Sequence, residues 1–124
     1  MTCNCNCTDN NTIEIVIGTT TLITFEFDES INGFTKAEFA IRKDYNVEPV
    51  VFKTITDLQG TSLDLEIAPV DTIDKFVFNN GKNSASYIWG LDLINENNGE
   101  RFNVFPQTGN PAPLCIVFKH VVEE

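Results

Sequence analysis

The chain from residue 86 to residue 94 reads Ser86-Tyr87-Ile88-Trp89-Gly90-Leu91-Asp92-Leu93-Ile94. Every second side chain, starting at Tyr87, is large and apolar, whereas the residues between them vary in size and polarity. A period of two places alternate side chains on one face of an extended strand. The stretch therefore predicts a central strand that carries Tyr87, Trp89 and Leu91 into a shared core.

The same alternation recurs along the chain between turn-forming residues. It predicts further strands at residues 12–17, 22–27, 36–42, 50–55, 63–67, 101–105 and 114–121. In two of these strands Phe25 and Phe39 face inward and join the predicted core. Residues 70–76 lack the period of two, and Asp71 is placed to cap a short helical turn there.

Composition supports an all-β chain. Val, Ile, Thr, Phe, Tyr and Trp make up 48 of the 124 residues, against 15 for Ala, Leu, Met and Gln. A chain of this length is expected to form one domain. We therefore expect a β-sandwich or β-barrel of about seven to nine strands over residues 12–124, preceded by a flexible, cysteine-rich tail at residues 1–11.

The charge balance excludes several classes of partner. Eight Lys and Arg face 18 Asp and Glu, which gives a net charge of -10, and the basic residues are scattered. Nothing in the sequence could neutralise a phosphate backbone or an anionic membrane surface, and no apolar run approaches the ~20 residues of a spanning helix. The N-terminus lacks the basic start and apolar stretch of a signal peptide, so we expect synthesis in a cytoplasm.

Three of the four cysteines, Cys3, Cys5 and Cys7, alternate with polar residues in the tail. In an extended tail their thiols would project to one side and could bind a soft metal ion. Zinc sites more often pair cysteines as Cys-x-x-Cys, so a reduced and flexible tail is the simpler interpretation. Disulfides between subunits, or a tail that orders on assembly, are further alternatives.

Catalytic chemistry finds little support in the sequence. His120 is the only histidine, and Cys115 lies five residues before it, on the opposite face of the same predicted strand. Asp64 and Glu66 alternate on a strand face that is expected to meet water. No phosphate loop, zinc-binding helix or nucleophile elbow occurs. We therefore expect no enzyme activity, no catalytic residues and no cofactor.

Four aromatic residues lie in or beside predicted loops, where alternation does not bury them. They are Tyr45, Phe76, Phe78 and Phe105. Exposed aromatic side chains can form a platform for sugars or a contact surface for another protein. These residues therefore fit either a carbohydrate-binding module or a protein-binding domain.

The segment Asn83-Ser84-Ala85-Ser86-Tyr87-Ile88-Trp89 resembles the tyrosine-corner region of immunoglobulin-like sandwiches. The resemblance implies an all-β, immunoglobulin-like antiparallel β-sandwich in which the Tyr87 hydroxyl bonds to the backbone a few residues upstream. Trp89 stands where such domains often have a cysteine, which implies a relative without a disulfide, suited to a reducing cytoplasm.

A longer stretch, residues 21–121, resembles the immunoglobulin-like N-terminal domain of phage baseplate upper proteins and related tail or fibre proteins. The shared layout includes Phe39-Ala40-Ile41-Arg42-Lys43, Leu63-Asp64-Leu65-Glu66-Ile67 and Asn98-Gly99-Glu100-Arg101. The resemblance implies a phage or prophage virion structural protein, a tail or baseplate adaptor or a decoration protein, made in the cytoplasm of a bacterial host. Its expected partners are other virion proteins and further copies of itself.

Overall fold

The computed structural model describes residues 3–107 and 109–119. Its elements, in chain order, are β1 (Cys3–Cys5), η1 (Asp9–Asn11), β2 (Ile13–Val16), β3 (Thr21–Phe27), β4 (Lys36–Arg42), β5 (Val51–Ile55), β6 (Ser62–Ile67), α1 (Pro69–Thr72), β7 (Ser84–Asn95), β8 (Glu100–Phe105) and β9 (Leu114–Phe118). All eight predicted strands are present, seven of them within two residues of their expected bounds. The last ends at Phe118, and His120 and Val121 lie outside the described residues.

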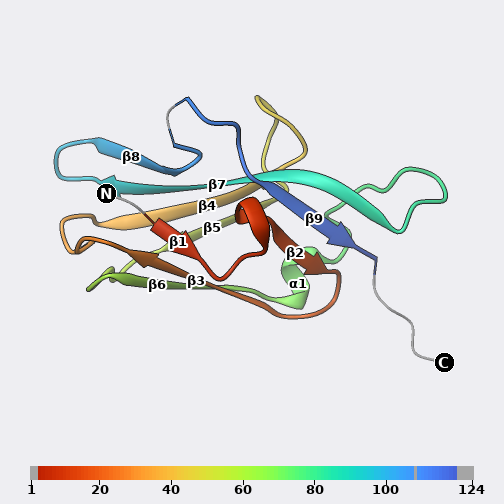
Figure 1. The fold of residues 1–124 in the computed structure, drawn as a ribbon, viewed down its shortest axis with the longest axis horizontal. Helices are drawn as coiled ribbons and strands as arrows, with labels where there is room; N and C mark the ends of the chain where they lie inside the picture. Colours follow the sequence, from red (N-terminus) through yellow and green to blue (C-terminus); the bar gives the residue numbers. More distant parts are fainter. Residues whose placement is uncertain (1–2, 108, 120–124) are drawn as a thin grey trace.

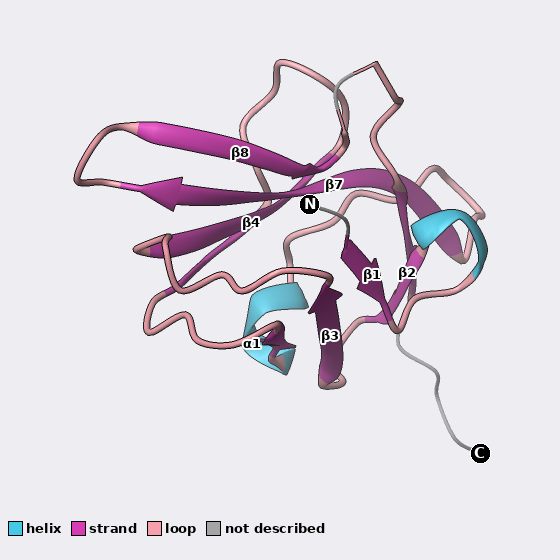
Figure 2. Cartoon of the chain, turned by 60° about the vertical axis from the view of Figure 1, so that its left-hand side comes forward, coloured by secondary structure: helices cyan, strands magenta, loops and turns pink. Residues whose placement is uncertain are grey.

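The strands form two sheets that pack face to face as an all-β sandwich (Figures 1 and 2). The small sheet has the order β1-β3-β6, and the large sheet has the order β2-β9-β7-β4-β5, with β8 beside β7. Neighbouring strands pair antiparallel, as expected, except that β2 pairs with β9 in parallel, with Ile13 opposite Cys115. The chain leaves the small sheet after β1 and enters the large sheet at β2.

Aromatic side chains fill the space between the two sheets. The five predicted core residues are all buried: Phe25, Phe39, Tyr87, Trp89 and Leu91. The Trp89 ring lies 5.7 Å from that of Phe39 and 5.9 Å from that of Phe25, measured between ring centroids. Trp89 therefore joins both layers of the core, and its indole N–H donates to the Asn11 carbonyl at 3.0 Å.

The strand β1 belongs to the sandwich, although the sequence analysis places the domain boundary at residue 12. β1 pairs with β3, with Cys3 opposite Phe27 and Cys5 opposite Phe25. Just beyond β1, the Asn6 amide oxygen accepts the Thr24 N–H at 2.9 Å. The Asn6 side chain thus extends the hydrogen bonding between β1 and β3. The alternation of cysteine with asparagine is itself a period of two, and it forms a strand here and not the expected flexible tail.

The Tyr87 hydroxyl does bond to upstream backbone, although its partner lies farther away in sequence than the few residues expected. The Val77 N–H donates to the buried Tyr87 hydroxyl at 2.7 Å, ten residues upstream of the tyrosine. Phe76, beside Val77, packs edge-on against the Tyr87 ring, with the centroids 4.9 Å apart. The segment before β7 is therefore fastened to the core by a residue that the sequence analysis singled out.

The predicted helical turn near residues 70–76 is present as α1, which is shorter than expected. Pro69 occupies the first turn, and the Asp71 carboxylate accepts the Ala68 N–H at 2.8 Å. Lys53 of β5 lies 2.6 Å from the same carboxylate, and this hydrogen bond lowers the Asp71 pKa. α1 is thereby tied to the edge of the large sheet.

Candidate functional site

A groove of about 310 Å³ crosses the outer face of the large sheet. Two loops border it, one between β4 and β5 and the other between β8 and β9, and both rise on the same side of the sheet in Figure 1. The Tyr45 hydroxyl accepts the Ala112 N–H at 2.8 Å and so links the two loops. The groove is lined by Glu38, Ala40, Arg42, Tyr45, Asn46, Phe52, Ile88, Gly90, Asp92, Arg101, Asn103, Pro106 and Ala112, with parts of Trp89 and Phe105.

Small residues on two neighbouring strands make the hollow. Ala40 of β4 and Gly90 of β7 are cross-strand partners, and Phe52 of β5 lies opposite Ala40 on its other side. A Cβ at Gly90 would lie only 2.9 Å from the Phe105 carbonyl oxygen, so the close approach of β8 requires glycine at this position. The floor of the groove is therefore low because the sheet geometry permits no side chain at Gly90.

A network of charged side chains lies at one end of the groove. Arg101 of β8 donates to Asp92 at 2.6 Å and to Glu38 at 3.2 Å, and Lys36 lies 3.4 Å from Glu38. The Asp92 hydrogen bond, followed by that of Glu38, raises the pKa of the Arg101 guanidinium. Three strands thus hold one guanidinium in a fixed orientation beside the apolar floor.

Two aromatic side chains of the groove are open to solvent. Tyr45 is 54% exposed and Phe52 is 51% exposed. Tyr45 is among the contact residues that the sequence analysis predicts, whereas Phe52 is not. The available signal was that Val51 and Ile55 occupy the inward positions of the same strand, which places Phe52 on the outer face.

The other three predicted contact aromatics do not present an exposed ring. Phe105 is buried and its ring lies 4.8 Å from that of Trp89, so its assignment as an exposed contact residue is wrong. The reason is a β-bulge: the register between β7 and β8 shifts at Leu91/Asp92, and Val104 and Phe105 are both buried. Phe76 and Phe78 are half-buried against the core, Phe78 beneath the Lys119 ammonium at 5.4 Å.

A second exposed surface lies on residues 70–78, which we call the 70–78 segment. Three branched apolar side chains of this segment point to solvent, with Val70 74% exposed, Ile73 51% and Val77 72%. The segment is nonetheless held at Thr72, whose side chain is buried and whose hydroxyl accepts the Gly18 N–H at 3.0 Å. In sequence it includes Phe76 and Phe78 and shares no residue with the groove.

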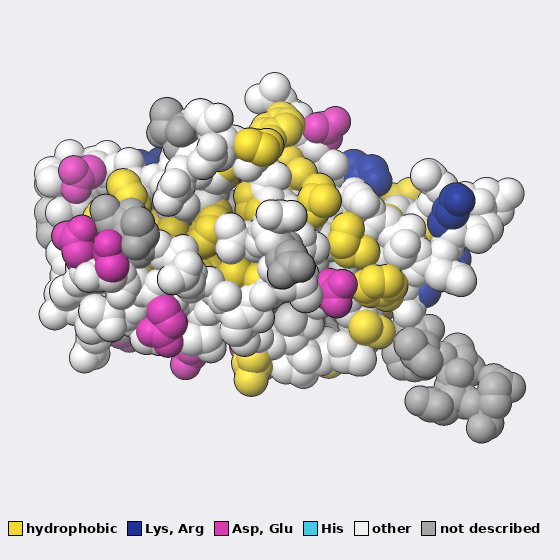
Figure 3. Space-filling view, viewed as in Figure 1, with side chains coloured by type: hydrophobic (Ala, Val, Ile, Leu, Met, Phe, Trp, Pro, Cys, Tyr) yellow, Lys and Arg dark blue, Asp and Glu magenta, His cyan; other side chains and the backbone are white. Residues whose placement is uncertain are grey.

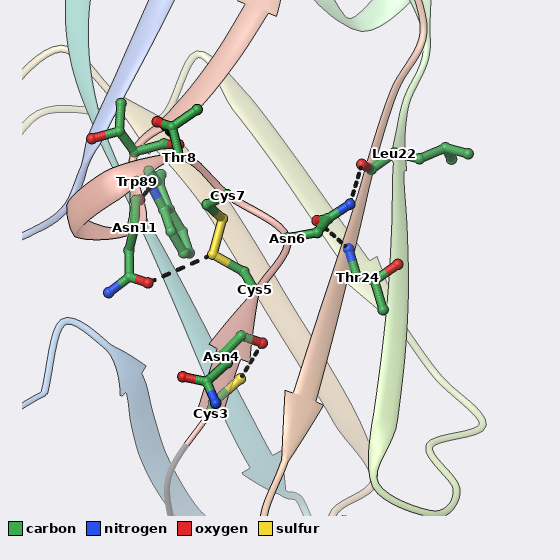
Figure 4. Close-up of a disulfide and its surroundings, with 11 residues drawn as sticks. Cys3, Asn4, Cys5, Asn6, Cys7, Thr8, Asn11, Leu22, Thr24 and Trp89 are labelled. Atoms are coloured by element: carbon green, nitrogen blue, oxygen red, sulfur yellow. Dashed lines mark hydrogen bonds between the residues drawn. A yellow bond between two sulfur atoms is a disulfide. The ribbon is translucent and has the colours of Figure 1, made fainter.

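The N-terminal cysteines do not form the predicted trio of free thiols. Cys5 and Cys7 are joined in a disulfide, and the Cys5 sulfur lies 3.7 Å from the Asn11 amide oxygen (Figure 4). The implication of a disulfide-free domain is therefore wrong for this structure. Cys3 remains a thiol, and burial, with Glu26 and Asp28 nearby, raises its pKa to about 12.

Asp64 and Glu66 project to solvent from β6, as expected for acids on a strand face that meets water. Cys115 is buried on β9, and burial raises the pKa of its thiol to about 12; its predicted relation to His120 falls outside the described residues. Within residues 3–107 and 109–119 no group of three or more His, Cys, Asp or Glu side chains is arranged to hold a metal ion.

No protein-family model and no curated protein sequence matches this chain. Among the described residues, no helix has both the length and the apolar character to cross a membrane.

Proposed function

We propose that this chain is a non-enzymatic structural protein of a phage or prophage virion, in which the sandwich joins tail or baseplate parts through protein contacts. The observation that carries the contact role is the 70–78 segment, which presents three apolar side chains to solvent from a firmly held backbone. The virion assignment rests on the sequence resemblance of residues 21–121 to baseplate and tail proteins.

The way the segment is anchored favours a binding role. Val77 is held through the Tyr87 hydroxyl, Thr72 through Gly18, and Asp71 through Lys53. A backbone fixed in this way loses little conformational entropy when a partner covers it. Exposed apolar side chains on such a support are typical of the central anchors of protein interfaces.

Charge on the remaining surface fits a subunit that assembles with chosen partners. Asp and Glu are spread over the face seen in Figure 3, where Lys and Arg occur in only a few places. With a net charge of -10, free copies repel one another at long range. On the edge strand β6, Asp64 and Glu66 point outward and discourage unspecific strand pairing.

The experiment compares the wild type with a double variant, Val70→Asp with Val77→Asp, and with the control Leu114→Asp. Leu114 is also an exposed apolar residue but lies on β9, outside the 70–78 segment. Light scattering after size exclusion measures oligomerisation, and titration against purified virion proteins from the same gene cluster measures partner binding. We expect a defined oligomer or a specific partner, with affinity about tenfold or more weaker in the double variant and unchanged in the control.

Circular dichroism and thermal unfolding first establish that all three proteins are folded. A wild type that stays monomeric at high concentration and binds none of those virion proteins would contradict the proposal. Equal binding by the double variant and the wild type would remove the 70–78 segment as the contact surface.

A further inference from the structure

We propose that the groove on the large sheet is a binding site for a neutral oligosaccharide. This site shares no residue with the 70–78 segment and does not rest on the virion assignment. Its volume of about 310 Å³ lies at the lower end of the ~300–1,000 Å³ range of small-ligand sites. The proposal follows from three properties of the lining: its aromatic faces, its fixed polar groups and its charge balance.

The aromatic faces are supplied by Phe52 and Tyr45. Both side chains are about half exposed, and both border the low floor at Ala40 and Gly90. The hydrogen bond to Ala112 holds the Tyr45 hydroxyl, so this ring is positioned before any ligand arrives. Aromatic faces beside a shallow floor suit the flat, apolar C–H face of a pyranose ring.

The polar groups match the other chemical property of a sugar, its rim of adjacent hydroxyls. Asp92 and Glu38 present carboxylate oxygens that accept hydrogen bonds, and both are oriented by Arg101. Asn103 and Asn46 each add an amide that can donate and accept. Neighbouring hydroxyls on a sugar offer donors and acceptors at similar spacing. Side chains that are already held in place can therefore bind these hydroxyls without first rearranging.

The charge balance selects a neutral ligand. Glu38 and Asp92 are offset by Arg42 and Arg101 within the groove, although the whole chain carries a net charge of -10. An acidic polymer would be repelled by the surrounding protein, and a basic peptide would find no excess of acid in the groove. A neutral, hydroxyl-rich chain meets neither obstacle.

The experiment starts with a glycan array that carries neutral hexose, deoxyhexose and N-acetylhexosamine oligomers together with uronic-acid oligomers. The best neutral glycan is then titrated by calorimetry into the wild type, Phe52→Ala and the control Leu22→Ala. Leu22 is likewise an exposed apolar residue, on β3 of the small sheet. We expect saturable binding of a neutral glycan, about tenfold weaker in Phe52→Ala and within about twofold of wild type in Leu22→Ala.

Backbone amide NMR shifts locate the site in the same titration. Changes centred on residues 90, 92, 101 and 103 support the proposal. Absence of binding to every neutral glycan overturns it, as does equal affinity in Phe52→Ala and wild type, or stronger binding of the uronic-acid oligomers. We expect the Val70→Asp, Val77→Asp variant to lose assembly and to keep glycan binding. Either proposal can therefore be contradicted while the other stands.

Discussion

At the scale of single residues, the two tyrosines of this chain form the same kind of hydrogen bond in different surroundings. Each hydroxyl accepts one backbone N–H, Tyr87 from Val77 at 2.7 Å and Tyr45 from Ala112 at 2.8 Å. Tyr87 is buried, whereas Tyr45 is largely exposed. The Tyr87 bond is part-buried and the Tyr45 bond is exposed, so water replaces the lost partner less readily at Tyr87.

We expect Tyr87→Phe to lower the free energy of unfolding by about 1–2 kcal/mol, and Tyr45→Phe by less than about 0.5 kcal/mol. Urea unfolding followed by Trp89 fluorescence measures both variants under one condition. Equal losses of unfolding free energy in the two variants would mean that the Tyr87 hydrogen bond contributes no more than an ordinary surface hydrogen bond.

The residue scale also shows where sequence reasoning reaches its limit. Alternation identified Tyr87 and Trp89 correctly because a straight strand keeps its period of two. It failed at Phe105 because the bulge breaks that period, and only the paired strand reveals a bulge. The groove could not be predicted, since it depends on the pairing of β4 with β7, two strands distant in sequence, which brings Phe52 near Gly90 and Arg101.

At the scale of elements, the close approach of β8 to β7 depends on one glycine. Ala at position 90 would place its Cβ against a backbone carbonyl, which cannot swing away as a side-chain end could. We expect Gly90→Ala to destabilise the fold by about 1–3 kcal/mol. The matched control is Gly33→Ala, because a Cβ there meets nothing within 4 Å.

Urea unfolding again measures the stability, and hydrogen exchange of the β8 amides shows where the change acts. We expect faster exchange in β8 for Gly90→Ala, whereas Gly33→Ala should change stability by about 0.5 kcal/mol or less. Unchanged protection of β8 would indicate that the sheet can move to accept the methyl group. In that case the low floor of the groove would not depend on glycine.

At the scale of the whole molecule, the excess of acid opposes both compaction and self-association. Eighteen Asp and Glu against eight Lys and Arg leave most carboxylates without a basic partner. The ion pairs around Glu38 and Asp71 are local and short, so moderate salt weakens them less than it weakens the long-range repulsion. Net repulsion should therefore dominate the response to salt.

We expect the midpoint of thermal unfolding to rise by roughly 2–6 °C as sodium chloride increases from about 10 mM to 150 mM. The variant Glu14→Gln with Glu66→Gln removes two exposed charges that make no ion pair within the described residues, so its midpoint should start higher and rise less. Differential scanning calorimetry at one protein concentration measures both slopes, with potassium chloride as a check on ion identity. A midpoint that falls with salt would show that the local ion pairs outweigh the overall repulsion. The charge argument for keeping free subunits apart would then lose its basis.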